Sequence, residues 1–226
     1  MGTLYIVATP IGNLDDITFR AVDTLKSVDV VACEDTRHTL KLLNHYGIKK
    51  PLLSCRSHNE EEAARKIASV LAKGEDVAYA SDAGTPGLSD PGSTLTTKIR
   101  NEGFAVIPIP GVSAAATLLS VAGHVGKTVT FEGFLSPKSG KRRKRLGELL
   151  ERGEGFIIYE SPYRIVKLLE DLADLNSKQY VCIGREMTKL HQEFKSGTVE
   201  EVLSYFQHEG TKKGEFSVFV SGKKKA

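Results

Sequence analysis

The sequence predicts an α/β protein with two domains, each holding a mixed, largely parallel sheet flanked by helices. Short apolar runs alternate with segments of helical periodicity. Three of these runs end in loops rich in glycine and proline, and no low-complexity linker interrupts the 226 residues. Alternating strands and helices are typical of a parallel sheet that is covered on both faces.

The N-terminal half is expected to contain four strands and four helices. Asp16 or Thr18 can cap the first helix, and Asn59 precedes three glutamates that suit a helix N-terminus. Gly47 and Gly74 lie where helices should stop. Strands are expected at residues 4–8, 28–33, 77–80 and 104–108, and helices at 18–26, 36–46, 59–73 and 93–102.

The C-terminal half begins with a small apolar helix over 113–121. We expect domains at 1–115 and 116–226 that share an interface, because no long linker separates them. The strands expected after this helix are 128–134, 156–160, 180–185, 192–196 and 215–220, and the helices are 142–152, 163–173 and 198–208.

Composition indicates an ordinary globular protein, with 40% hydrophobic and 26% charged residues and a net charge of +3. The apolar runs are strand-length and the N-terminus lacks a basic region with a cleavage site, so we expect a cytoplasmic protein without membrane contact. Cys33, Cys55 and Cys182 are odd in number and widely spaced, which argues against disulfides or a zinc site. No metal is expected.

The loops at 4–16, 77–92 and 104–116 are the main functional signal. Glycine lacks a Cβ and proline fixes φ, so such loops bring bare backbone against a ligand. In open α/β sheets, ligands bind outside the carboxyl ends of the strands. One such loop alone is better explained as a tight turn, whereas three together favour a small-molecule site.

Within these loops, Asp82 lies where a strand-end acid commonly meets a ribose diol. Backbone groups at 84–85 and 113–114 suit an adenine or a carboxylate. Two familiar phosphate-binding patterns are missing. No G-x-G-x-x-G follows the first strand, and GHVGKT at 123–128 has Val121 in place of the first P-loop glycine. Both nicotinamide and NTPase chemistry are therefore disfavoured.

The chain also resembles a known family. In order along residues 3–220 it contains ATPIGNLDDITFRA, EDTRHT, SDAGTPGLSDPG, PIPGVSA, FEGFL, YESPYR and REMTKLHQEF. These strings are similar to those of the ribosomal RNA small subunit methyltransferase I family, within the tetrapyrrole methylase superfamily. The resemblance implies a two-domain homodimer that binds S-adenosylmethionine between its domains. It also implies 2′-O-methylation of a cytidine ribose in the decoding region of 16S rRNA, either free or in the 30S subunit.

The resemblance further implies which residues contact the cofactor. In the first domain they come from the three loops, and in the second domain from the ends of strands 156–160 and 180–185. The expected cofactor-binding residues are Pro10, Asp82, Thr85, Ser113, Ala114, Glu160 and Met187.

A basic run, PKSGKRRKR at 137–145, suits an RNA substrate, because phosphate neutralisation dominates nucleic-acid affinity. Basic residues at a helix start oppose the macrodipole, which favours a partner over a merely solvated surface. The Lys223–Lys225 tail is a weaker candidate. The expected RNA contacts in the run are Lys141, Arg142, Arg143, Lys144 and Arg145.

Two further segments carry candidate RNA contacts. In EDTRHT, Asp35 can cap a helix and leave Arg37 and His38 exposed to RNA, although an ordinary cap with a local Asp–Arg pair explains it equally well. In YESPYR, Tyr163 can stack on an unpaired base and Arg164 can meet a phosphate. The single histidines His58, His124 and His191 have no partner at catalytic spacing and are expected to be structural.

Methyl transfer from a sulfonium requires the ribose oxygen to be held in line with the methyl–sulfur bond. Because a ribose hydroxyl is a poor nucleophile, a base can assist. Glu186 is the first candidate, followed by Glu34 and Asp35, and proton loss to solvent is the alternative. Two other functions remain open: methylation of a small molecule such as a tetrapyrrole precursor, and a non-catalytic RNA-binding assembly factor.

Overall fold

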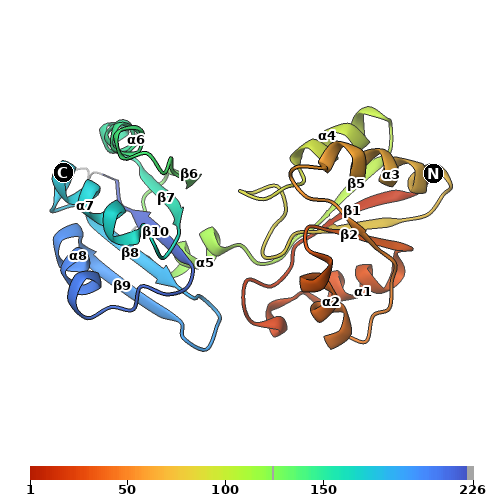
Figure 1. Cartoon of the computed structure of the whole chain (residues 1–226), viewed down its shortest axis with the longest axis horizontal. Helices are drawn as coiled ribbons and strands as arrows, with labels where there is room; N and C mark the ends of the chain where they lie inside the picture. Colours follow the sequence, from red (N-terminus) through yellow and green to blue (C-terminus); the bar gives the residue numbers. More distant parts are fainter. Residues whose placement is uncertain (124, 223–226) are drawn as a thin grey trace. The chain divides into compact units, whose positions relative to one another are not determined.

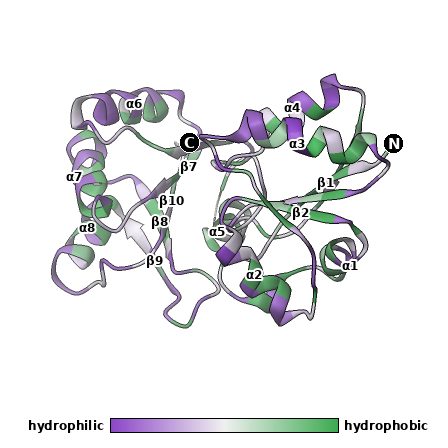
Figure 2. Ribbon diagram, turned by 45° about the vertical axis from the view of Figure 1, so that its right-hand side comes forward, coloured by the Kyte–Doolittle hydropathy of each residue, from purple (hydrophilic) through white to green (hydrophobic). Residues whose placement is uncertain are grey.

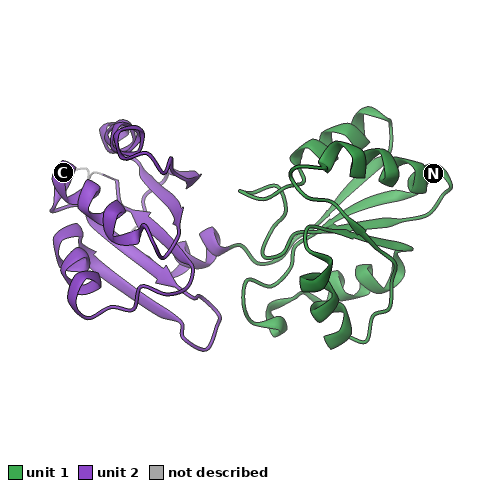
Figure 3. Cartoon of the chain, in the orientation of Figure 1, with its two compact units in different colours: residues 1–113 green, residues 114–226 purple. Residues whose placement is uncertain are grey.

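The computed structural model describes residues 1–123 and 125–222, so the predictions for His124 and for Lys223–Lys225 lie outside the described residues. The chain divides into two compact units, Met1–Ser113 (unit 1) and Ala114–Ala226 (unit 2), coloured separately in Figure 3. The division falls between two residues that were both expected to contact the cofactor.

Unit 1 is built on a five-stranded sheet with the order β3-β2-β4-β1-β5. Every neighbouring pair is parallel, so all the carboxyl ends of these strands meet at one edge. The strand β3 was not expected, because its three residues follow a Lys-Lys-Pro turn and show no clear period. The strands are β1 (Thr3–Val7), β2 (Val30–Cys33), β3 (Leu52–Ser54), β4 (Val77–Ala80) and β5 (Ala105–Ile109).

Helices cover both faces of this sheet, with α1 and α2 on one face and α3 and α4 on the other (Figure 1). Leu4 packs with α3 and α4, whereas Val7 packs with α1 and α2, as the alternation of a strand requires. Thr18 caps α1 by accepting a hydrogen bond from the Ala21 amide. The helices are α1 (Phe19–Ser27), α2 (Thr36–His45), α3 (Glu60–Ala72) and α4 (Ser93–Asn101), and a short 3-10 turn, η1, spans Leu14–Asp16.

Unit 2 also holds a five-stranded sheet, with the order β6-β7-β10-β8-β9. It is mixed, as expected, but most of its pairing is antiparallel. β6 and β7 are parallel, whereas β10 runs antiparallel to β7 and β8, and β8 runs antiparallel to β9. A short loop joins β8 to β9, which forces them to run in opposite directions. The strands are β6 (Val129–Phe134), β7 (Gly155–Glu160), β8 (Tyr180–Arg185), β9 (Glu193–Thr198) and β10 (Phe216–Val220).

The helices α6, α7 and α8 share one hydrophobic core with the sheet of unit 2, and α5 contacts β8 and β10. Figure 2 shows hydrophobic and hydrophilic residues on the same helix, for example on α6, as amphipathic packing requires. Within the described parts of the chain, each helix is too short or too polar to cross a bilayer. The helices are α5 (Ala114–Val121), α6 (Ser139–Arg152), α7 (Ile165–Asn176) and α8 (Val199–His208).

Candidate functional site

The three glycine- and proline-rich loops are bonded to one another at the carboxyl edge of the unit 1 sheet. Thr9 and Gly84 exchange two backbone hydrogen bonds, of 2.9 and 3.0 Å. The Thr9 hydroxyl donates to the Ser81 carbonyl at 3.1 Å, and the Thr85 hydroxyl donates to the Val112 carbonyl at 3.0 Å. The loops that follow β1, β4 and β5 therefore form one connected backbone surface.

Close backbone approach explains why small residues occur at this junction. A Cβ on Gly111 would lie 2.9 Å from the Cβ of Ala8, so a larger residue would push the β1 and β5 loops apart. Pro10 is buried beside the junction, and Ser113 and Ala114 are half-buried where the β5 loop enters α5. Five expected cofactor residues, Pro10, Asp82, Thr85, Ser113 and Ala114, thus lie on these loops or at the start of α5.

Asp82 connects the loop after β4 to the end of β2. Its Oδ1 accepts a hydrogen bond of 2.9 Å from the Asp35 amide. Asp35 in turn caps α2 by accepting from the Arg37 amide at 2.8 Å, and this bond lowers the pKa of Asp35. The expected cap is present, and Arg37 and His38 are exposed on the first turn of α2.

Carboxylates gather at this edge from three separate segments, at Glu34, Asp82 and Asp90. Burial, followed by the charge of Asp82, raises the pKa of Glu34. Burial, followed by the charges of Glu34 and Asp82, raises the pKa of Asp90 to about 6. Arg56 opposes this effect at Glu34, and its Nε donates to the Glu34 carbonyl at 3.1 Å. Acids perturbed by burial and by like charges are typical of functional sites.

Tyr79 lies under the turn at 87–92. Its side chain is 0% exposed, and its hydroxyl has no hydrogen-bond partner among residues 1–123 and 125–222. A Cβ on Gly92 would lie 2.9 Å from its Cε1. Glu60, also buried, fixes the end of the turn by accepting from the Gly92 amide at 2.9 Å and the Leu95 amide at 2.8 Å. The roles of Tyr79 and Glu60 were not evident in the sequence, because each depends on residues distant along the chain.

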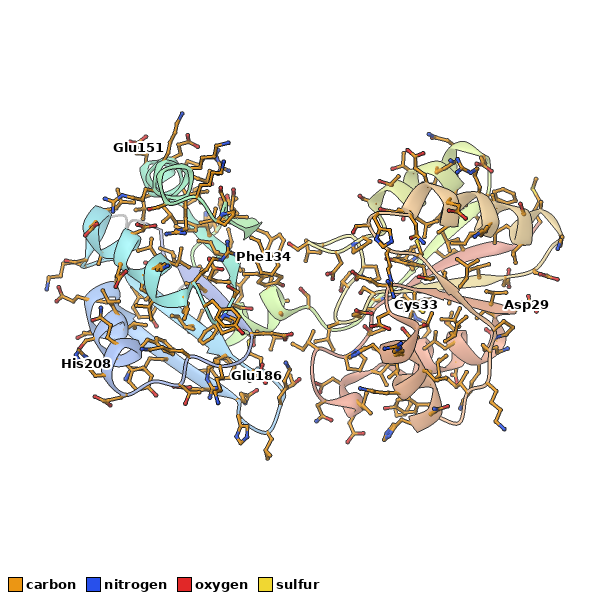
Figure 4. The ribbon with its side chains drawn as sticks, in the orientation of Figure 1. Asp29, Cys33, Phe134, Glu151, Glu186 and His208 are labelled. Atoms are coloured by element: carbon orange, nitrogen blue, oxygen red, sulfur yellow. The ribbon has the colours of Figure 1, made fainter. Side chains whose placement is uncertain are left out.

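Glu186, labelled in Figure 4, follows β8 in unit 2. Its φ is +49°, in the left-handed region. Its Oε1 accepts from Lys189 Nζ at 2.9 Å and from the Glu215 amide at 2.9 Å. Burial alone would raise its pKa, but these hydrogen bonds lower it. Met187 is buried, with its Sδ 2.6 Å from the position of a Cβ on Gly184. The Glu186 carboxylate thus holds the turn together through Oε1, and these hydrogen bonds make it a weaker base.

Glu160 ends β7 with a side chain that is 0% exposed. Its Oε1 accepts from the Ser161 amide at 2.7 Å and from Arg164 Nη2 at 2.6 Å. Its Oε2 is buried and has no partner within the described part of the chain. Arg164 is therefore held by Glu160, whereas Tyr163 beside it is 90% exposed.

The arginines of the basic run bind carboxylates of unit 2. Arg142 is only 3% exposed, and its Nε donates to Asp171 Oδ2 at 2.7 Å. Arg143 Nη1 lies 3.4 Å from Asp171 and 2.5 Å from Asp174. These residues join α6 to α7. The structure thus places Arg142 in the interior and not on the surface where phosphate contact was expected. Residues 139–145 of the run lie within α6, and Arg142 is on the helix face that packs inward with Leu146 and Leu149.

Arg145 is also paired, because its Nε and Nη2 donate to the two oxygens of Glu132 at 2.7 and 2.8 Å. Its Nη1 donates to Glu148 at 3.0 Å. The lysines of the run differ, since they are exposed and enter no ion pair with the described residues. They are Lys138, Lys141 and Lys144, which we call the α6 lysines.

A group of aromatic side chains from β6 and β7 was not predicted from the sequence. Phe131 and Phe134 pack edge to face against Tyr159, with ring centroids 5.1 and 5.8 Å away. Phe134 is 58% exposed and is labelled in Figure 4. The Tyr159 hydroxyl accepts from the Ala115 amide at 3.0 Å. Phe131 and Phe134 are three positions apart in FEGF, so regular strand alternation would place them on opposite faces. The register of β6 shifts between Phe131 and Gly133, and no signal in the sequence indicates this shift.

Comparisons with known proteins agree with this architecture. The family model for Tetrapyrrole (Corrin/Porphyrin) Methylases matches residues 3–203. Among solved structures, the methyltransferase CobJ matches with a TM-score of 0.73 at 17% identity, covering 98% of this chain and 95% of that one. The cobalt precorrin-4 methyltransferase CbiF matches with a TM-score of 0.72 at 17% identity, covering 97% and 94%. At this identity the two structures show the fold alone.

Curated relatives are more similar in sequence. The "Ribosomal RNA small subunit methyltransferase I" of Borrelia garinii subsp. bavariensis is 50% identical over 96% of this chain and 98% of its own. The protein of the same name from Halalkalibacterium halodurans is 46% identical over 98% of this chain and 76% of its own. The chain therefore belongs to the ribosomal RNA small subunit methyltransferase I family, among the tetrapyrrole methylases.

Proposed function

We propose that this protein transfers a methyl group from S-adenosylmethionine to the 2′-oxygen of a cytidine ribose in the decoding region of 16S rRNA, in the cytoplasm. Family membership supports methyl transfer to ribosomal RNA. The observation that carries the proposal is the hydrogen-bonded meeting of three glycine- and proline-rich loops at one edge of unit 1. Such an edge is the usual ligand position in an open α/β sheet.

The residues of this edge fit a nucleoside that carries a sulfonium. The Asp82 carboxylate suits a ribose diol, and backbone groups of 84–85 and 113–114 suit an adenine or a carboxylate. When bound, S-adenosylmethionine supplies an electrophilic methyl group on a positively charged sulfur. Nearby carboxylates complement that charge. In unit 2, Glu160 Oε2 is buried without a partner among the described residues, and contacts of Glu160 and Met187 with the donor stay predictions.

We assign RNA contact to side chains that are exposed and that form no ion pair within the described part of the chain. The α6 lysines are exposed without ion pairs among the described residues, and Arg37 and Tyr163 are exposed as well. Lysines of this kind bind phosphates, and an exposed tyrosine can stack on an unpaired base. We therefore propose that the α6 lysines bind the rRNA backbone, with Arg143, Arg145 and Arg164 mainly positioning the surface around them.

The test is transfer of a radiolabelled methyl group to 30S subunits from cells that lack the activity, with free 16S rRNA assayed in parallel. We expect label in RNA, and one ribose at which the chain resists alkaline hydrolysis. Label on a tetrapyrrole precursor instead would favour the small-molecule reaction. Absence of both transfer and donor binding would favour a non-catalytic assembly factor.

We also propose that the protein is a homodimer. A single chain of 226 residues offers limited surface to a structured rRNA, and a second copy doubles the basic surface available. Light scattering after size-exclusion chromatography should give twice the mass of the chain, and a monomer mass at micromolar concentration would contradict this.

A further inference from the structure

Three carboxylates, those of Glu34, Asp82 and Asp90, gather at the edge of unit 1, and the proposed function gives a role only to Asp82. We propose that Asp90 is the base that accepts the proton of the ribose hydroxyl during methyl transfer. This inference rests on the proposed function and deepens it. It assigns proton removal to the turn at 87–92, in place of Glu186.

Asp90 has no interaction that would occupy its carboxylate. It forms no hydrogen bond and no ion pair with the described residues, although it is half-buried. Its turn is nevertheless held in place, because the Gly87 amide donates to the Pro91 carbonyl at 3.2 Å and Glu60 fixes Gly92. Ser89 adopts a left-handed φ of 67°, a strained conformation that is common at functional sites. The fold thus presents a partly desolvated carboxylate and leaves its oxygens available.

Tyr79 provides a second, independent observation. Burial raises the pKa of the Tyr79 hydroxyl, and the charges of Cys55, Glu34, Glu60 and Asp90 add to the effect. This hydroxyl has no partner in the described structure, yet a buried unpaired donor costs about 1–3 kcal/mol. A buried hydroxyl under the turn that carries Asp90 is therefore left unsatisfied by the described residues. An arrangement of this kind is expected where a ligand completes the hydrogen bonds.

The electrostatics suit a base at neutral pH. Burial raises the pKa of Asp90 to about 6, with Glu34 and Asp82 adding to the effect, so Asp90 is ionised at pH 7 and still a useful proton acceptor. Arg56 counteracts the shift at Glu34, while Glu60 is occupied by two amides. By contrast, hydrogen bonds lower the pKa of the Glu186 carboxylate, which makes Glu186 the weaker base.

The step balances without any further reagent. The ribose oxygen loses its proton to the Asp90 carboxylate and forms a bond to the methyl carbon. The methyl–sulfur bond breaks, and its electron pair stays on sulfur, which becomes a neutral thioether. The carboxylic acid of Asp90 then releases the proton to solvent.

The test is the single-turnover rate of methyl transfer against pH, at saturating donor and 30S subunit. For the unmodified protein we expect the rate to rise with slope one and level off near pH 6. Asp90→Asn should lower the rate about 100-fold or more and remove this rise. Glu34→Gln should move the rise to lower pH, because one negative charge near Asp90 is removed. Glu61→Gln, which changes an exposed residue of α3, should alter neither the rate nor its dependence on pH.

The outcomes separate this inference from the proposed function. Calorimetry should give the same S-adenosylmethionine affinity for Asp90→Asn and the unmodified protein, and the variant should still unfold cooperatively, which shows that it is folded. If Asp90→Asn stays within threefold of the unmodified rate with the same pH rise, the inference is overturned and the proposed function stands. An unmodified protein that transfers no methyl group to RNA overturns both.

Discussion

Two clusters of charge in this molecule differ in how they are paired. At the carboxyl edge of unit 1, Glu34 and Asp90 are half-buried with shifted pKa values, and Asp90 has no cationic partner among the described residues. In unit 2, Arg142 and Arg145 are each bonded to carboxylates of neighbouring elements. A dense run of charge in a sequence therefore does not by itself mark a binding surface. A charged side chain is a better candidate for ligand binding when no residue of opposite charge in the same fold is already paired with it.

The largest effect is expected on stability, at the buried ion pair of Arg142 and Asp171. Arg142→Ala leaves the buried carboxylate of Asp171 without its 2.7 Å partner, and we expect the free energy of unfolding to fall by about 3–5 kcal/mol. Urea denaturation measures this. Lys141→Ala, one residue earlier and exposed, should change it by less than about 0.5 kcal/mol. Equal effects of the two changes would remove the distinction between arginines and lysines in this run.

The next largest effect is expected at the acidic cluster of unit 1, which consists of Glu34, Asp82 and Asp90. Asp82→Ala should weaken S-adenosylmethionine binding about 10- to 100-fold, since hydrogen bonds to a charged group contribute about 1.5–3 kcal/mol. Calorimetry measures it, and RNA affinity should stay the same. Asp29→Ala is the matched control, because Asp29 also accepts a backbone amide, that of Asp76 at 2.7 Å, but lies at the opposite end of β2 (Figure 4). Equal donor affinity for Asp82→Ala and the unmodified protein would exclude Asp82 from the site.

The α6 lysines test the other side of the comparison. Replacing all three with alanine should weaken rRNA binding and flatten its salt dependence, by about 0.7 in log–log slope for each single-strand phosphate that is no longer neutralised. Stability should not change. A variant with the same net charge, in which the exposed Lys26, Lys49 and Lys73 of unit 1 become alanine, controls for total charge. If the control variant flattens the slope as much, the α6 lysines have no special role.

Asp90 should also affect stability with a definite sign. Its pKa rises from 3.8 to about 6 on folding, so between these values the folded protein binds more protons than the unfolded chain. The unmodified protein therefore loses stability as pH rises through that window, and Asp90→Asn does not. The variant should become more stable than its parent by up to about 1 kcal/mol at pH 7.5, allowing for solvent screening of a half-exposed group. Urea denaturation at pH 4 and at pH 7.5 measures the difference in unfolding free energy between the variant and its parent. The same difference at both pH values would contradict this prediction.

The smallest effect is expected at Glu186. Glu186→Gln keeps an oxygen that accepts from the Glu215 amide and loses only the charge that faces Lys189. Since such an ion pair is partly exposed, we expect less than about 1 kcal/mol of destabilisation and a methyl-transfer rate within threefold. A 100-fold loss of rate with normal stability would instead make Glu186 the base and contradict the role proposed for Asp90.

Local patterns predicted the elements well, because periodicity and capping are encoded within a few residues. The helix expected at 198–208 is observed as Val199–His208, with a capping box between Thr198 and Glu201. The three-residue strand β3 and the antiparallel pairing of unit 2 were not predictable in this way, since both depend on which strands meet in the folded chain.

The site was predictable only in part, for the same physical reason. Glycines and prolines at strand ends identified the loops, because their effect on the backbone is local. The use of Glu60 to hold Gly92, and of Asp171 to hold Arg142, depends on residues about thirty positions apart. The arginine run therefore looked free in the sequence although its partners were already present elsewhere in the chain.

The three cysteines have a practical consequence. Cys33, Cys55 and Cys182 are all buried, and burial raises the pKa of each thiol, that of Cys55 to about 12. Thiol-directed dyes react with exposed thiolates, so the natural protein should take up almost no label at neutral pH. A single cysteine introduced at the exposed Glu151 of α6 would therefore carry a fluorophore at a defined position and report the arrival of RNA without background.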